Sequence, residues 1–284
     1  MTSRKPKIPQ SLISILESCQ NEDRDQHHFP PTEVFNEGWM LRLVLDALEN
    51  LEKTVGVPDT HPLKFCKGAK WYSEARLSSP FLRKPKKDLP GKDKDTLGEG
   101  YTNGDGVIGH FKFREGTKAG LQLTNSACQF IVVEAKMFST LSSGTKNAPS
   151  YNQAARTVAC MAEIIRQSRI SLDHLKSVGF FVVAPEEKLQ QLGKNSLRAY
   201  VTQDAIKNAI DQRMSDYESA FRSDKQLCEW KNGVDRFLKR LAAENRLGAL
   251  SWEQLIKEIT AVDRARGDEL DQFYECCKKI GKSK

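Results

Sequence analysis

The chain has 284 residues, of which 39% are hydrophobic and 29% are charged, so it can bury the core of one large domain or of one domain with an extension. No window approaches the roughly 18 consecutive apolar residues of a membrane span, and residues 1–16 make a poor secretory signal. We therefore expect an intracellular protein, cytoplasmic if bacterial, with no membrane partner.

The net charge of +7 and the pI near 9.0 favour a polyanionic partner such as nucleic acid. This evidence is weak by itself, because many basic proteins bind no nucleic acid. The seven cysteines are scattered, and no C-x-x-C pair occurs. Their pattern argues against a structural zinc site or a disulfide framework and favours reduced thiols.

The first helix is predicted to follow an irregular N-terminal segment, residues 1–31. Thr32 is a good N-cap residue, and apolar residues with helical spacing come after it: Val34, Leu41, Val44, Leu48 and Leu51. Glu37 falls on this apolar stripe. Either it meets a partner or a metal, since a lone buried carboxylate is costly, or it lies near solvent and favours the N-terminal dipole.

A strand is predicted at 69–79, where Glu74 and Arg76 share a face. These two side chains either pair with each other, which we favour, or line a cleft. The next segment, 83–95, reads RKPKKDLPGKDKD, and its proline and glycine content makes it a loop. It is either a solvated linker, which composition alone favours, or a mobile basic loop that contacts phosphates.

Two further strands are predicted to form an antiparallel pair. The first, 101–113, begins with turn chemistry in the sequence NGDG and becomes apolar at Val107. Asp105 has the same parity as Val107, so it lies at the start of the apolar side. The loop REGTKAG then leads into the second strand, within 121–138, which contains the apolar run FIVV.

A polar loop, 142–150, precedes a predicted helix that ends near 169 and begins with a capping box formed by Ser150 and Gln153. The entirely apolar strand that follows, 178–185, fits a sheet covered on both faces.

From about 204 onward the pattern is helical, and four amphipathic segments fit it: 204–222, 225–243, 251–264 and 267–280. These helices are expected to cap the sheet, to bind a protein partner or to form a homodimer face. The sequence thus predicts an α/β fold, a central mixed sheet flanked by helices, with three parts: an N-terminal segment 1–31, a core 32–200 and a helical C-terminal extension 201–284.

The sequence EAK at 134–136 carries the most distinctive chemistry. Alternate strand residues point to the same face, so Glu134 and Lys136 project together. Pairing the two predicted strands can bring Asp105 beside Glu134, and two carboxylates that close repel unless a cation lies between them. Oxygen ligands without His or Cys suit Mg²⁺ or Mn²⁺. The competing interpretations are an ordinary ion pair at a strand end and an ordinary turn residue at Asp105.

This arrangement resembles the PD-(D/E)XK nucleases, the restriction-endonuclease-like superfamily. The resemblance spans about 32–185 and consists of an Asp, then Glu-x-Lys on a central strand, then Gln at the start of the next helix. The helix–strand–strand–strand–helix–strand order also matches the core of that superfamily. A literal Pro-Asp is lacking, because Gly104 precedes Asp105.

The resemblance implies a role for each matched position. Asp105, Glu134 and the backbone carbonyl of Ala135 would bind Mg²⁺, for which Mn²⁺ may substitute. Lys136 would contact the attacking water or the scissile phosphate, and Gln153 would orient the water or a phosphate. Glu37 matches a position where some branches place an extra acid near the metal.

The expected function is therefore metal-dependent hydrolysis of DNA phosphodiester bonds, of the restriction endonuclease type. The expected phosphate-binding side chains are Lys84, Lys86, Lys87, Lys146 and Arg156. Two alternatives stay open: a non-cleaving DNA-binding or assembly subunit that keeps the fold, and a chance match in an unrelated α/β protein.

Overall fold

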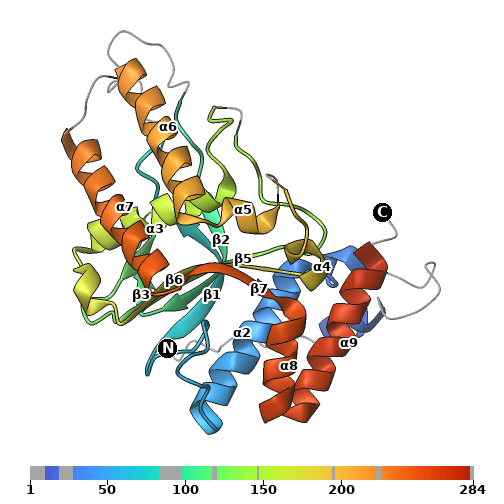
Figure 1. Cartoon of the computed structure of the whole chain (residues 1–284). Coiled ribbons are helices and arrows are strands. Elements are labelled where there is room, and N and C mark those ends of the chain that lie inside the picture. The colour runs from blue at the N-terminus through green and yellow to red at the C-terminus, as the bar shows by residue number, and fades with distance from the viewer. Residues whose placement is uncertain are drawn as a thin grey trace.

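The computed structural model describes residues 10–18, 28–82, 97–116, 120–145, 147–193, 196–221 and 225–281. It is an α/β protein built around one five-stranded mixed sheet, with helices on both faces (Figure 1). No helix within these residues is long and apolar enough to cross a membrane.

The five strands of the main sheet lie in the order β1-β2-β5-β6-β7. Strand β2 runs antiparallel to both of its neighbours, β1 and β5, whereas β5, β6 and β7 run parallel to one another. A separate hairpin, β3 with β4, is inserted between β2 and β5. The strand bounds are β1 Lys70–Leu77, β2 Thr102–Gly109, β3 Phe111–Phe113, β4 Leu121–Leu123, β5 Gln129–Ala135, β6 Ser177–Ala184 and β7 Leu247–Ser251.

Two helical layers cover the sheet, and β5 supplies side chains to both of them. Phe130 and Val132 belong to the buried cluster shared with α3, α6 and α7. Ile131 and Val133 belong to the cluster shared with α2, α8 and α9. The continuous apolar run of β5 therefore follows from burial on both faces. Figure 1 shows the orange helices α6 and α7 lying apart from α2 (blue) and from α8 and α9 (red).

The helix bounds differ little from those expected from periodicity in the C-terminal part. The α-helices are α1 Gln10–Glu17, α2 Glu37–Thr54, α3 Gln153–Ser168, α4 Glu186–Leu189, α5 Leu197–Tyr200, α6 Gln203–Phe221, α7 Lys225–Ala243, α8 Trp252–Val262 and α9 Arg264–Gly281.

Two predicted helix starts were wrong. Pro31–Glu33 forms a 3₁₀ turn that includes Thr32, and α2 begins only after Asn36, whose side chain accepts from the backbone N–H of Trp39. For α3 the N-cap is Asn152 instead of Ser150, and its side chain accepts from the N–H of Ala155. In both cases an asparagine nearer the helix satisfies the exposed N–H groups of the first turn.

The predicted strand 101–113 is divided at Gly109, where φ is +154°. A Cβ there would lie 2.3 Å from the carbonyl oxygen of Gln129, so the backbones of β2 and β5 approach too closely for a side chain. The chain leaves the main sheet at this point, and the expected hairpin forms from β3 and β4.

The sequence pattern predicted a helical C-terminal part, but this part also contains a strand. The segment Leu247–Ser251 is strand β7, which pairs in parallel with β6 and extends the sheet. Residues of α6 and α7 also pack into the same buried cluster as α3. The predicted extension 201–284 therefore contributes one strand to the sheet and helices to each of the two layers that cover it.

A buried ion pair joins α6 to the chain just before β2. The Nε of Arg213 lies 3.2 Å from Oε1 of Glu99, and the two side chains are 0% and 4% exposed. The guanidinium also lies over the rings of Phe81, Tyr151 and Tyr217 and donates to the carbonyl of Leu97. Burial raises the pKa of Glu99, and the charge of Arg213 opposes that rise.

We predict that Arg213→Met lowers the free energy of unfolding by about 3–5 kcal/mol, because Glu99 stays buried without its main counter-charge. Chemical denaturation measures the change. Arg266→Met is the matched control: its partner Asp46 and Arg266 itself are 42% and 32% exposed, so the loss should stay below about 1 kcal/mol. Equal losses in the two variants would contradict the structural role assigned to Arg213.

Candidate active site at the end of strand β5

The structure brings Asp105 next to Glu134. Gly106 of β2 pairs with Val133 of β5, so the next step of the antiparallel register sets these two acids opposite each other. Oδ2 of Asp105 accepts a hydrogen bond from the backbone N–H of Ala135, 2.8 Å away. Beyond the last paired residues of β2 and β5, the Asp105 side chain accepts the hydrogen bond of the Ala135 N–H, and this contact fixes its carboxylate beside Glu134.

The carboxylate of Glu134 is fully buried and is held by two side chains of α3. Nε2 of Gln153 donates to Oε2 over 2.8 Å, and Oγ1 of Thr157 donates to Oε1 over 2.9 Å. Gln153 and Thr157 are four residues apart and therefore share one face of the helix. The sequence analysis identified Gln153 but missed Thr157. Residues four apart lie on the same face of a helix, so Thr157 could have been predicted to face the site together with Gln153.

The pKa of Glu134 is raised well above its ordinary value. The main cause is burial, which disfavours the charged form, and the second is the charge of Asp105. Lys136 and the hydrogen bond from Thr157 oppose the rise. A cation bound between the two acids would stabilise the charged form of this carboxylate.

Lys136 lies at the end of β5 with its backbone fixed on both sides. Its N–H donates to the carbonyl of Val183 over 2.8 Å, and its own carbonyl accepts from Nε1 of Trp252 at 3.0 Å. The residue is only 9% exposed. None of the hydrogen bonds and ion pairs found within the described residues involves its ammonium group. Its charge lowers the pKa of both Glu134 and Glu74, so the ammonium lies close to these carboxylates.

Glu74 of β1 and Arg42 of α2 border these acids. Nη2 of Arg42 lies 3.8 Å from Oε1 of Glu74, and Nε of Arg42 donates to Oγ of Ser73 at 2.9 Å. Arg76, which we expected to pair with Glu74, lies with its guanidinium over the ring of Tyr101. The prediction that Glu74 pairs with Arg76 was therefore wrong, because Glu74 pairs with Arg42; that the two residues line a cleft stays a prediction.

Of the remaining predicted residues, Glu37 and Arg156 make their contacts elsewhere. Glu37 is the first residue of α2, and its charge contributes to the raised pKa of Cys277 in α9, which places it near that helix. Arg156 of α3 has a buried Nε without a hydrogen-bond partner, and its charge acts on Glu99 and Tyr151. Ala135 is buried, and the role of its carbonyl stays a prediction. Lys84, Lys86, Lys87 and Lys146 lie outside the described residues.

Asp105 and Glu134 form a two-acid set of the kind that suits Mg²⁺. Within the described residues, no group of three or more His, Cys, Asp or Glu side chains is arranged to hold a metal ion. Mg²⁺ is usually bound by one or two carboxylates and keeps several of its waters. Two adjacent carboxylates therefore fit this ion, with waters or backbone oxygens completing its coordination.

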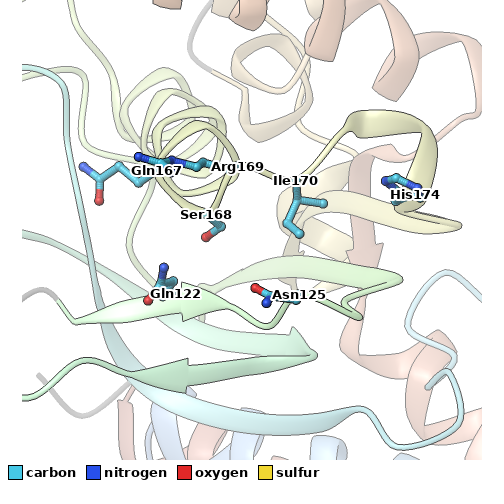
Figure 2. Close-up of a pocket in the computed structure, with 7 residues that line it drawn as sticks. All are labelled: Gln122, Asn125, Gln167, Ser168, Arg169, Ile170 and His174. Atoms are coloured by element: carbon cyan, nitrogen blue, oxygen red, sulfur yellow. The ribbon is translucent and has the colours of Figure 1, made fainter.

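A cavity of about 500 Å³ lies elsewhere, at the opposite end of α3 (Figure 2). Its lining is mostly polar: Gln122, Asn125, Gln167, Ser168, Arg169, Ile170 and His174. Part of this lining already has a structural task, since Oγ of Ser168 accepts from the N–H of Leu123 and so ties β4 to α3. The cavity does not include the acids at the end of β5.

No protein-family model, no curated protein and no solved structure matches this chain. The side chains at the end of β5 are therefore the basis for assigning a function.

We predict that Glu134→Gln is more stable than the wild type at pH 8 in EDTA, with a gap that closes in acid. A carboxyl whose pKa is raised by folding weakens the folded state as pH rises from the unfolded pKa through the folded one. Below both values the proton is bound in either state and the penalty vanishes. Denaturation at a series of pH values measures the gap, and a wild type more stable than Glu134→Gln at pH 8 would contradict the assignment.

We also predict that Trp252→Phe lowers the free energy of unfolding by about 1–3 kcal/mol, because the buried carbonyl of Lys136 loses its indole donor. Trp39→Phe is the control: Trp39 is 43% exposed, and exposed substitutions usually change stability by within about 0.5 kcal/mol. Chemical denaturation of both variants tests the difference, which should be absent if the indole N–H does not contribute.

Proposed function

We propose that this chain is a metal-dependent nuclease that hydrolyses DNA phosphodiester bonds, an endonuclease of restriction type, with Mg²⁺ as cofactor and Mn²⁺ as a substitute. One observation carries the proposal. At the end of β5, the adjacent carboxylates of Asp105 and Glu134 lie next to Lys136, a residue that is 9% exposed and whose ammonium has no hydrogen bond or ion pair among the described residues.

The arrangement of the core supports the proposal. The order α2–β1–β2–β5–α3–β6 follows the order implied by the resemblance to the restriction-endonuclease-like superfamily, with the β3–β4 hairpin as an insertion. Asp105 lies on β2, Glu134 and Lys136 lie at the end of β5, and Gln153 is the first residue of the next helix. The matched residues thus occupy neighbouring element ends.

Each side chain has a defined task in this mechanism. A divalent ion bound by the two acids would lower the pKa of its bound water and neutralise charge that develops on the phosphate. Lys136 would stabilise the same phosphate with its ammonium. Gln153 donates to Glu134 in the structure, so its task here is to position that carboxylate. The rigid strand holds these groups to the small tolerance that catalysis requires.

The net charge of +7 supports DNA as the partner, because electrostatic attraction to phosphates supplies most non-specific binding. The alternative is a DNA-binding or assembly subunit that does not cleave. It stays open because helices α6 to α9 lie outside residues 32–185, which the resemblance covers. In that case the C-terminal helices would offer the surface for a protein partner or a second copy of the chain.

We predict that the wild type cleaves plasmid DNA in Mg²⁺ or Mn²⁺ and not in EDTA. Glu134→Gln and Lys136→Ala should each reduce kcat by about 10²–10³-fold, because each removes an electrostatic group at the reacting phosphate. Lys112→Ala is the matched control, since Lys112 is an exposed lysine of β3, and it should cleave like the wild type.

Two outcomes would contradict the nuclease proposal. DNA binding that survives EDTA, together with no cleavage in either metal, would favour the non-cleaving subunit. Cleavage that Glu134→Gln and Lys136→Ala leave unchanged would show that another site, or a contaminant, is responsible.

A further inference from the structure

Glu74 lies directly across the β1–β2 ladder from Asp105. The pairs Ser73–Gly106 and Ala75–Gly104 flank this position on both sides. Glu74 has a φ of +56°, although it is not glycine and lies within a strand. The other described non-glycine residues with positive φ, Arg169 and Asn245, come directly after helices or in the turn that follows. A strained residue inside a strand redirects its side chain and is often found next to a functional site.

The charges around Glu74 connect it to the same group of residues. Its pKa is raised first by burial and then by the charge of Asp105, whereas Arg42 and Lys136 lower it. Its side chain is 50% exposed, and its ion pair with Arg42 is long, at 3.8 Å. The charges of Asp105 and Lys136 thus act on Glu74, whose only ion pair among the described residues is the long one with Arg42.

We propose that Glu74 is a third acid of the metal site and binds the hydrated ion through one of the ion's water molecules. This inference rests on the proposed function and adds to it a residue that the sequence motif does not contain. Lys136 is the independent sign that this region receives a charged ligand: the residue is 9% exposed, its ammonium has no hydrogen bond or ion pair among the described residues, and its charge acts on Glu74 and Glu134.

Binding through water follows from the geometry of the metal-free protein. Glu74 does not form a three-membered metal-binding group with Asp105 and Glu134. Because Mg²⁺ and Mn²⁺ sites retain waters, an acid beyond direct contact can still accept hydrogen bonds from the ion's hydration shell. Such outer-shell partners typically contribute about 10–100-fold to metal affinity.

The test measures Mn²⁺ binding to the full chain without DNA, by the EPR signal of free Mn²⁺. We expect Glu74→Gln to raise the Kd for Mn²⁺ about tenfold, and Glu275→Gln, an exposed acid paired with Lys278 on α9, to leave it unchanged. The water proton relaxation of bound Mn²⁺ counts its water ligands, and this count should be the same in Glu74→Gln as in the wild type.

The variant Arg42→Gln separates metal binding from a purely structural task of Glu74. If Glu74 only holds Arg42 in place, Arg42→Gln should weaken Mn²⁺ binding as much as Glu74→Gln does. Under the proposal Arg42→Gln does not weaken it, because a competing cation has been removed. Glu74→Gly adds a control for folding: it should also weaken Mn²⁺ binding, while its Tm does not fall, because glycine adopts positive φ without strain.

The outcomes distinguish this inference from the proposed function. An unchanged Kd in Glu74→Gln, with Mn²⁺ binding lost in Asp105→Asn, overturns the role of Glu74 and leaves the two-acid metal site intact. One additional water ligand in Glu74→Gln also overturns it, because that result means direct coordination. A wild type that binds no Mn²⁺ overturns both.

Discussion

The constraint on which the site depends is the burial of the Glu134 carboxylate next to Asp105. Glu134 is fully buried, and both burial and the neighbouring acid disfavour its charged form. Protein donors from Gln153 and Thr157 satisfy its oxygens, but they do not neutralise its charge. A pair of acids held in this way is costly; the charge of Lys136 offsets part of this cost, and a cation bound between the acids would offset more.

Elements from both faces of the sheet hold the end of β5 in place. On one face α3 supplies Gln153 and Thr157 to Glu134. On the other, the indole of Trp252 at the start of α8 binds the carbonyl of Lys136, and Trp252 belongs to the cluster shared with α2 and α9. Glu134 and Lys136, two residues apart at the end of β5, are therefore fixed from opposite sides of the sheet, which restrains the separation between the two residues.

The sequence predicted the helices and strands with strong hydrophobic periodicity. The alternation of side chains along the strands also predicted to which face of the sheet Asp105 and Glu134 point. The bounds of α7 match those expected, and Asp105 lies at the end of the β2–β5 pairing as the hairpin argument required. The five-residue β7 was missed because a short edge strand, LGALS, has no period of its own and forms only against β6. The positive φ of Glu74 was also invisible, since no glycine or asparagine signals it. Contacts such as Trp252 with Lys136 depend on tertiary packing over 116 residues of sequence, which no local pattern encodes.

The C-terminal part, expected as an extension of the core, also contacts the backbone at the end of β5. Strand β7 pairs with β6, and α8 begins directly after β7. Trp252, the first residue of α8, therefore lies close enough to donate to the carbonyl of Lys136. On the opposite face Arg213 of α6 holds Glu99, three residues before β2 begins, and β2 carries Asp105. The backbone of Lys136 and the segment before β2 thus both receive contacts from beyond residue 200. The segment 99–136, which carries the proposed site, is therefore held partly by side chains that lie more than 100 residues further along the chain.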